Sequence, residues 1–256
     1  MSSNSSLPVF SLARHSLIIC SISISRLVDN GSLFFSRFEI MKKSIALFLI
    51  FFLTFTASFG QQHTFEAEVR QLSQGLDSIG WSSGETVFTG SSTIKLWRSL
   101  TEITQGKVVL NTGFGGSKAI DLERYLFPLV LKFDPKRVFI YEGDNDLWAG
   151  IEPEEILASL DRIVTRIQLA APNTEIYLIG AKPSPSRWSK KDVYQFFNQQ
   201  LEKYSQEKEG VSFIDTWATL TDSIGNARPE LYIKDQLHLN ADGYVLWNGI
   251  FKSYFN

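Results

Sequence analysis

One segment indicates the fold class most clearly, and it reads Glu85-Thr86-Val87-Phe88-Thr89-Gly90-Ser91-Ser92-Thr93-Ile94-Lys95-Leu96. Its first five residues are rich in β-branched and aromatic side chains, which favours a β-strand. Gly90 ends this strand, hydroxyl residues follow, and a helical pattern begins at Ile94. A short strand that turns sharply into a helix is typical of a βαβ unit, so this stretch predicts a parallel sheet.

The same alternation continues to the end of the chain. After the first strand at 85–89, short apolar runs predict further strands at 107–110, 137–141, 175–179 and 211–214. Helical patterns lie at 64–79, 120–131, 153–170, 191–207 and 241–254. We therefore predict an α/β fold, a single three-layer α/β/α domain with a five-stranded, mostly parallel sheet and helices on both faces.

The first 60 residues are organised differently. Met41-Lys42-Lys43 precedes an uncharged apolar segment at 45–55 and small residues near Gly60, which is the order found in a secretory signal peptide. The apolar segment is shorter than the roughly 20 residues that a membrane span needs. We predict a signal peptide at 41–60, export to the periplasm or the extracellular space, and no stable membrane insertion after cleavage. A retained N-terminal anchor is the alternative.

Residues 1–40 are rich in serine and precede the better start at Met41. We interpret them as a disordered, over-extended start, which peptides from 1–40 in the native protein would contradict. Residues 61–256 then form one domain, large enough for its own core. The whole chain has a net charge of −2 and its leader is basic, so the domain is acidic and no nucleic-acid partner is expected. The only cysteine lies in the leader, which excludes a disulfide scaffold or a thiol enzyme.

Ligands of open parallel sheets bind beyond the carboxyl ends of the strands, so the residues there are the candidates for chemistry. Of the two histidines after residue 60, His63 lies close to the expected cleavage point, which leaves His238 as the candidate base. Asp235 precedes it by three residues, a spacing that puts both side chains on one side of a helical turn. A carboxylate there can fix the imidazole tautomer. Capping of the final helix is the alternative for this pair.

A hydroxyl nucleophile is expected on a sharp strand-to-helix turn, and Ser91, Ser92 and Thr93 occupy one. Helix capping by these residues is the alternative. The tetrahedral intermediate of ester cleavage also needs donors for its oxyanion. The Gly115-Gly116 pair allows close approach of backbone N–H groups, and Asn145 in Gly143-Asp144-Asn145-Asp146 offers an amide.

These four blocks, taken in order, resemble the SGNH hydrolases, also known as GDSL-type esterases and lipases. The resemblance runs from about Glu85 to Trp247 and implies a flavodoxin-like fold. It implies Ser92 as nucleophile, Asp235 and His238 as the other members of a catalytic triad, and Ser92, Gly116 and Asn145 as the oxyanion hole. One position departs from the family pattern, because Ser91 stands where the G-D-S-L signature has aspartate. Register with the family selects Ser92 over Ser91.

The implied activity is that of a secreted serine esterase, which needs no metal and no organic cofactor. The expected substrate is a small-molecule or glycan ester with a short acyl group, such as acetyl on a carbohydrate or lipid. Trp148 and Trp188 follow two of the strands and are candidates for substrate binding, with packing as their alternative. Two other functions stay open: a non-catalytic glycan-binding module on the same fold, and a metal-dependent phosphoester hydrolase that uses Asp144, Asp146, Asp235 and His238.

Overall fold

Five strands form one sheet in the order β2-β1-β3-β4-β5, and all four pairings are parallel. Their bounds are β1 Thr86–Gly90, β2 Val109–Asn111, β3 Arg137–Tyr141, β4 Glu175–Ile179 and β5 Val211–Ile214. The computed structural model describes residues 65–255, so the predicted signal peptide and the predicted over-extended start lie outside the described residues. The predicted α/β fold with a five-stranded sheet is confirmed, and the strand order is that of flavodoxin-like folds.

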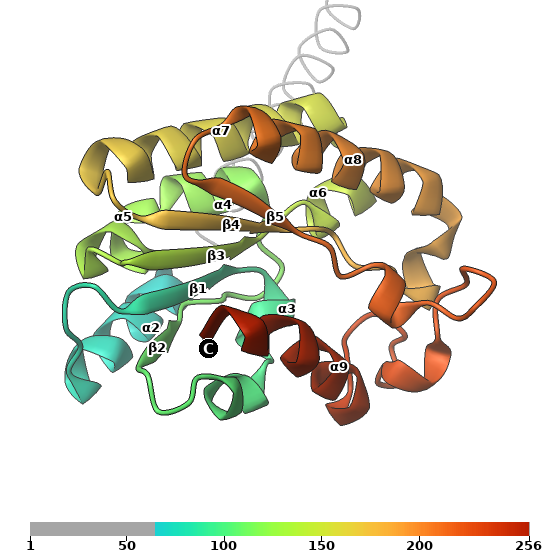
Figure 1. The fold of residues 1–256 in the computed structure, drawn as a ribbon, viewed down its shortest axis with the longest axis horizontal. Coiled ribbons are helices and arrows are strands. Elements are labelled where there is room, and N and C mark those ends of the chain that lie inside the picture. Colours follow the sequence, from blue (N-terminus) through green and yellow to red (C-terminus); the bar gives the residue numbers. More distant parts are fainter. Residues whose placement is uncertain (1–64, 256) are drawn as a thin grey trace, which may run out of the picture. The chain divides into compact units, whose positions relative to one another are not determined.

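Helices cover both faces of this sheet (Figure 1). One face packs against α2 Glu66–Ile79, α4 Ala119–Arg124, α5 Leu126–Leu129, α7 Pro153–Ala170 and α8 Lys191–Glu207. The other face packs against α3 Ser92–Lys95 and α9 Ala241–Phe251. A hydrophobic core lies on each face of the sheet, and each strand contributes to both because its side chains alternate between the faces. Val138 and Ile140 belong to the core on the first face, and Phe139 and Tyr141 to the core on the second.

Aromatic rings dominate the second core. Phe88 stacks on Phe139 with ring centroids 4.2 Å apart, and Phe139 stacks on Tyr177 at 4.5 Å. Phe251, at the end of α9, packs edge-on against Phe88 and Phe139. The last helix is therefore fixed to the middle of the sheet, and the loop before α9 is held at the carboxyl ends of the strands.

Several elements differ from the prediction. The single helix expected at 120–131 is two short helices, α4 and α5, followed by a 3-10 turn at Leu131–Phe133. Tyr125 leaves the helical region between them, and Pro128, which lacks an N–H group, lies where a continuous helix would need one. The last helix ends at Phe251 and continues as the 3-10 turn Lys252–Phe255. A short helix that was not predicted, α6 Asp144–Trp148, follows β3 directly.

Candidate active site

The turn from β1 into α3 places Ser92 at the carboxyl edge of the sheet. Gly90 has φ of +124°, and a Cβ atom there would lie 2.1 Å from the carbonyl oxygen of Tyr141, so only glycine fits. Ser91 is buried, whereas Ser92 is partly exposed as the first residue of α3. The turn therefore presents the Ser92 hydroxyl, and not that of Ser91, to solvent.

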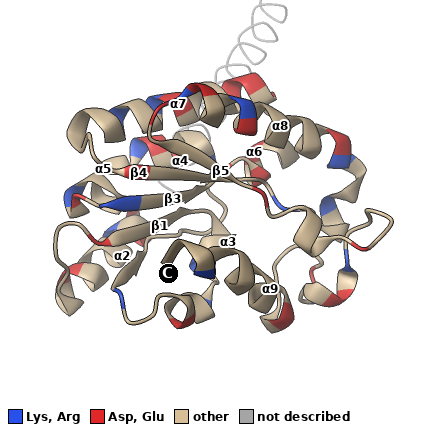
Figure 2. Ribbon diagram, viewed as in Figure 1, with Lys and Arg blue, Asp and Glu red and all other residues tan. Residues whose placement is uncertain are grey.

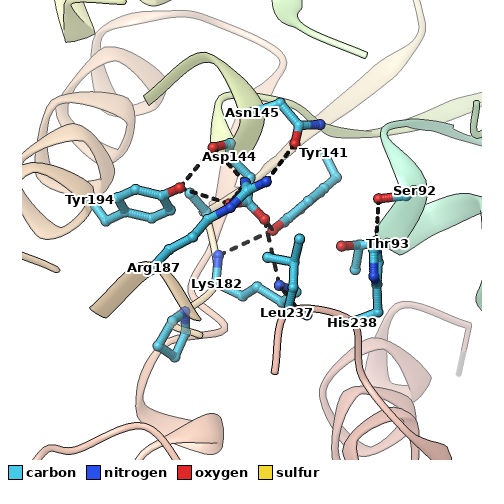
Figure 3. Close-up of polar contacts among 12 residues, drawn as sticks. Ser92, Thr93, Tyr141, Asp144, Asn145, Lys182, Arg187, Tyr194, Leu237 and His238 are labelled. Atoms are coloured by element: carbon cyan, nitrogen blue, oxygen red, sulfur yellow. Dashed lines mark hydrogen bonds and ion pairs between the residues drawn. The ribbon is translucent and has the colours of Figure 1, made fainter. Parts of the chain in front are cut away.

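Ser92, His238 and Asp235 form a continuous hydrogen-bonded chain. Ser92 Oγ lies 2.8 Å from His238 Nε2, and His238 Nδ1 lies 2.6 Å from Asp235 Oδ2. Figure 3 shows the Ser92 and His238 side chains pointing toward one another. Because the carboxylate accepts from Nδ1–H, Nε2 is left with a lone pair to accept the hydroxyl proton. The structure thus brings together the three residues predicted from the sequence as a triad.

The loop that carries Asp235 and His238 is not the helical turn that their spacing suggested. It is a tight turn closed by an antiparallel bridge between Tyr232 and Leu239, with Gln236 at φ of +57°. Helix α9 is capped by Asn240, whose side chain accepts from the N–H of Gly243, so Asp235 and His238 do not serve as that cap. The irregular turn has the same outcome as a helical one, since both side chains still meet.

Asp235 is held in its ionised form. Partial burial alone would raise the pKa of its carboxyl group, but the His238 side chain and the N–H groups of His238 and Leu237 donate to it and lower the pKa to about 2. A carboxylate with this many donors stays negative and oriented at any pH at which the fold is expected to work. It can therefore fix the His238 tautomer and stabilise a protonated ring.

Two of the predicted oxyanion donors are backbone N–H groups, one in the turn from β1 into α3 and one in the loop after β2. The N–H of Ser92 is at the first position of α3, where helical N–H groups lack an intrahelical acceptor. The loop after β2 packs against this turn, because the N–H of Phe114 donates to the carbonyl of Gly90. In that loop Gly116 is exposed, has φ of +76°, and directs its N–H to no acceptor among residues 65–255.

Asn145 reaches the same loop from the next strand. It is the second residue of α6, which begins right after β3, the direct neighbour of β1 in the sheet. Its Nδ2 donates to the carbonyl of Ser117 at 2.9 Å, which ties its amide to the residue that follows Gly116. Strands β1 and β3 flank the point where the strand order reverses, the usual ligand site of such sheets. The three predicted oxyanion donors therefore come from adjacent elements at that point.

The model of the GDSL-like lipase/acylhydrolase family matches residues 77–246, which include every one of these groups. The chain belongs to this family. It is accordingly an ester-hydrolysing enzyme, and the resemblance to SGNH hydrolases seen in the sequence is confirmed.

Solved structures of other proteins share this fold. A Streptococcus pneumoniae protein, provisionally described as a platelet activating factor, aligns with a TM-score of 0.66 and 22% identity, over 81% of this chain and 99% of its own. A GDSL-like lipase from Bacteroides thetaiotaomicron aligns at 0.60 and 18%, over 75% and 95%. An acetyl-xylooligosaccharide esterase from Geobacillus stearothermophilus aligns at 0.57 and 17%, over 68% and 95%. No curated protein matches the chain by sequence.

This GDSL-family site has a buried charge cluster beneath it that was not predicted from the sequence. Asp144 binds Arg187 through its Oδ1 atom at 2.6 Å and lies 3.5 Å from Lys182 through Oδ2. Tyr141 and Tyr194 also donate to its carboxylate, at 2.9 Å each. Lys182 donates in turn to the carbonyl of Leu237, next to His238, at 2.7 Å. Asp144 is thereby connected to both the Asn145 side and the His238 side of the site.

The one carboxylate of this cluster faces two cationic side chains, Lys182 and Arg187. Burial alone would raise the pKa of Asp144, but Lys182 and Arg187 outweigh that effect and hold the pKa below its usual value. Burial lowers the pKa of Lys182, and the Asp144 charge opposes that shift. The one sequence signal for the cluster is a lysine just after the apolar strand β4, in Gly180-Ala181-Lys182-Pro183.

The two candidate substrate-binding tryptophans have different surroundings. Trp148, at the end of α6, is 47% exposed, and the cationic groups of Arg187 and Lys190 lie over its ring at 5.6 and 5.5 Å. Trp188 is partly buried and stacks on Trp217 with ring centroids 6.1 Å apart. Trp148 is therefore an exposed aromatic residue with two cations over its ring, three residues beyond Asn145, while Trp188 is engaged in packing.

Charges elsewhere on the described surface are mixed. Figure 2 shows lysine, arginine, aspartate and glutamate interspersed along α7 and α8. Within residues 65–255, no three His, Cys, Asp or Glu side chains are grouped so that they could hold a metal ion. In the same part of the chain, no helix has the length and apolarity needed to cross a membrane.

Proposed function

We propose that the protein is a secreted serine esterase in which Ser92 is the nucleophile, His238 the general base and Asp235 the residue that orients it. The observation that carries this proposal is the unbroken chain from Ser92 Oγ through His238 to Asp235, with distances of 2.8 and 2.6 Å. Nucleophile, base and orienting group within hydrogen-bond reach are the signature of an activated serine.

The reaction is a two-step acyl transfer. His238 Nε2 takes the Ser92 proton as Oγ attacks the ester carbonyl, and the N–H groups of Ser92 and Gly116 and the Asn145 amide stabilise the oxyanion. The protonated imidazole, stabilised by the Asp235 carboxylate, then gives its proton to the leaving alcohol. Water repeats the sequence on the acyl-enzyme and releases the acid.

A short acyl group, such as acetyl on a carbohydrate or lipid, is the substrate class that we propose. Trp148 is exposed three residues beyond Asn145, and a flat aromatic ring suits the apolar face of a sugar or an acyl chain. Export through the leader at 41–60 would bring the enzyme to acetylated glycans outside the cytoplasm. The acetyl-xylooligosaccharide esterase with the same fold is in accord with this choice.

Hydrolysis of p-nitrophenyl acetate by residues 61–256 tests the proposal. The matched variants are Ser92→Ala and Ser91→Ala, neighbours in one turn of which only Ser92 contacts His238. We expect kcat to fall by at least about 10⁴-fold in Ser92→Ala, and to change by less than about threefold in Ser91→Ala. EDTA should leave the rate of wild-type protein unchanged.

The opposite result is equally informative. Folded wild-type protein without turnover would contradict the esterase and favour a glycan-binding module. Loss of activity in Ser91→Ala but not in Ser92→Ala would move the nucleophile by one residue, and loss on addition of EDTA would favour metal-dependent hydrolysis.

A further inference from the structure

The Asn145 side chain is held from both ends. Its Nδ2 donates one hydrogen to the carbonyl of Ser117 at 2.9 Å, and its Oδ1 accepts from Arg187 Nη2 at 3.0 Å. A rotated amide would set Nδ2 against the guanidinium donor and Oδ1 against the Ser117 carbonyl, so each contact would become a repulsion. Only one orientation satisfies both partners, and it leaves the second Nδ2 hydrogen available.

Arg187 can act on Asn145 because it is itself fixed. Its Nη1 donates to the Oδ1 and backbone O atoms of Asp144, at 2.6 and 2.9 Å, while its Nη2 reaches Asn145. The residue is buried, with 9% of its surface exposed. Figure 3 shows its planar group between the two consecutive residues. A lysine, with a single ammonium group, could not span these contacts in the same way.

We propose that Arg187 is a positioning residue of the oxyanion hole. It fixes the orientation of the Asn145 amide, and its charge-assisted hydrogen bond to Oδ1 draws electron density from the amide, so that the free Nδ2–H donates more strongly to the oxyanion. This inference rests on the proposed esterase function and adds a residue that acts on the oxyanion through Asn145. The Asp144 carboxylate compensates the positive charge that this arrangement brings into the site.

The neighbouring Lys190 provides a matched control. It belongs to the same 3-10 segment, Pro185–Lys190, and its Nζ donates to the carbonyls of Leu147 and Trp148 in α6. It also lies over the Trp148 ring, at nearly the same distance as Arg187. Of these two cationic side chains, only Arg187 donates a hydrogen bond to Asn145, so Lys190→Gln should leave kcat within about twofold of wild type.

The test is a double-mutant cycle measured as kcat and KM on p-nitrophenyl acetate, with Arg187→Gln, Asn145→Ala and the double variant beside wild type. We expect Arg187→Gln to lower kcat on the order of tenfold or more, the loss of one hydrogen bond to a charged group, with KM within about twofold. Asn145→Ala should lower kcat about 10²–10³-fold. The double variant should then match Asn145→Ala within about twofold, because Arg187 has nothing left to position.

Each other outcome has a defined meaning. If Arg187→Gln lowers kcat by the same factor in wild-type protein and in Asn145→Ala, the inference is overturned. That result would show that Arg187 acts on protein folding or on the substrate. A rise in KM alone would overturn it in favour of a substrate contact. Arg187→Lys keeps a charge beside Asp144, so it replaces Arg187→Gln in the cycle if the latter fails to fold, with the same criterion. Wild-type protein whose turnover survives Ser92→Ala would instead refute the proposed function.

Discussion

At the scale of single residues, the site depends on where each polar atom finds its partner. Asp235 uses both carboxylate oxygens: Oδ2 binds His238 Nδ1, and Oδ1 accepts from the N–H groups of Leu237 and His238. An asparagine would offer the same shape, but its Nδ2 would face Nδ1 and favour the wrong imidazole tautomer. The charge of Asp235 therefore matters as well as its position.

We predict that Asp235→Asn lowers kcat by about 10²–10⁴-fold without loss of fold. The pKa of Asp235 is lowered to about 2, below its usual value. Its carboxylate is therefore fully charged at any pH above that usual value, and the stabilisation that the charge provides is lost only as the pH falls through about 2. The factor by which Asp235→Asn lowers kcat should therefore be the same at pH 6 and pH 8. Pre-steady-state or steady-state rates at both values check this, and a loss that disappears at either pH would contradict it.

Sequence alone could identify the site residues that have a characteristic local spacing or that follow a predicted strand. Asp235 and His238 are three residues apart, and Ser92 and Asn145 directly follow predicted strands, so their proximity follows from sheet topology. Lys182 and Arg187 meet Asp144 from about 40 residues away, and no spacing rule predicts that contact. Such a buried network is determined by tertiary packing, which a single sequence does not display.

At the scale of elements, Lys182 connects the end of β4 to the loop before α9. Its side chain is fully buried, close to Asp144 Oδ2 and bonded to the Leu237 carbonyl. We predict that Lys182→Met lowers the free energy of unfolding by about 3 kcal/mol. This value is at the lower end of the range for breaking a buried ion pair, because Arg187 still pairs with Asp144.

Chemical denaturation measures this prediction, with Lys234→Met as the control because Lys234 is exposed in the same loop. The control should change stability by less than about 0.5 kcal/mol. A similarly small effect of Lys182→Met would show that the cluster does not hold the loop.

Elements with a strong apolar period were predicted to the residue. Strands β3, β4 and β5 and helices α7 and α8 have the bounds that their sequence patterns indicated. The strand β2 begins two residues later than expected, at Val109, and the helix expected at 120–131 is broken. The bounds of β2 and the break in that helix depend on tertiary contacts and on local backbone geometry, which the hydrophobic pattern does not reveal.

At the scale of the whole molecule, stability should depend on carboxyl groups buried under the site. Burial raises the pKa of Asp146 to about 6 against the opposing effect of N–H donors, and burial raises the pKa of Glu142 well above its usual range. Each has one buried oxygen without a hydrogen-bond partner among the described residues. When the pKa of a carboxyl group is higher in the folded protein than in the unfolded chain, the folded protein binds more protons at any pH between these two values. The free energy of unfolding therefore falls as the pH rises through that interval.

We predict that Asp146→Asn gains stability relative to wild type as the pH rises from 4 to 7, by up to about 3 kcal/mol. Denaturation curves for both proteins at pH 4, 5, 6 and 7 give the difference, which removes the contribution of other titrating groups. A difference that does not change with pH would show that Asp146 is not protonated in the fold.

The order of elements along the chain also sets when the site can exist. All five strands are complete at Ile214, yet His238 lies beyond them, and Trp247 and Phe251 of the last helix fill the core on one face of the sheet. A ribosome that has synthesised the whole sheet has therefore not yet produced the proposed base or the helix that covers that face. Chains released early would lack both at once. Premature termination should thus yield fragments that are recognised by proteases as incomplete, rather than stable enzymes of reduced activity.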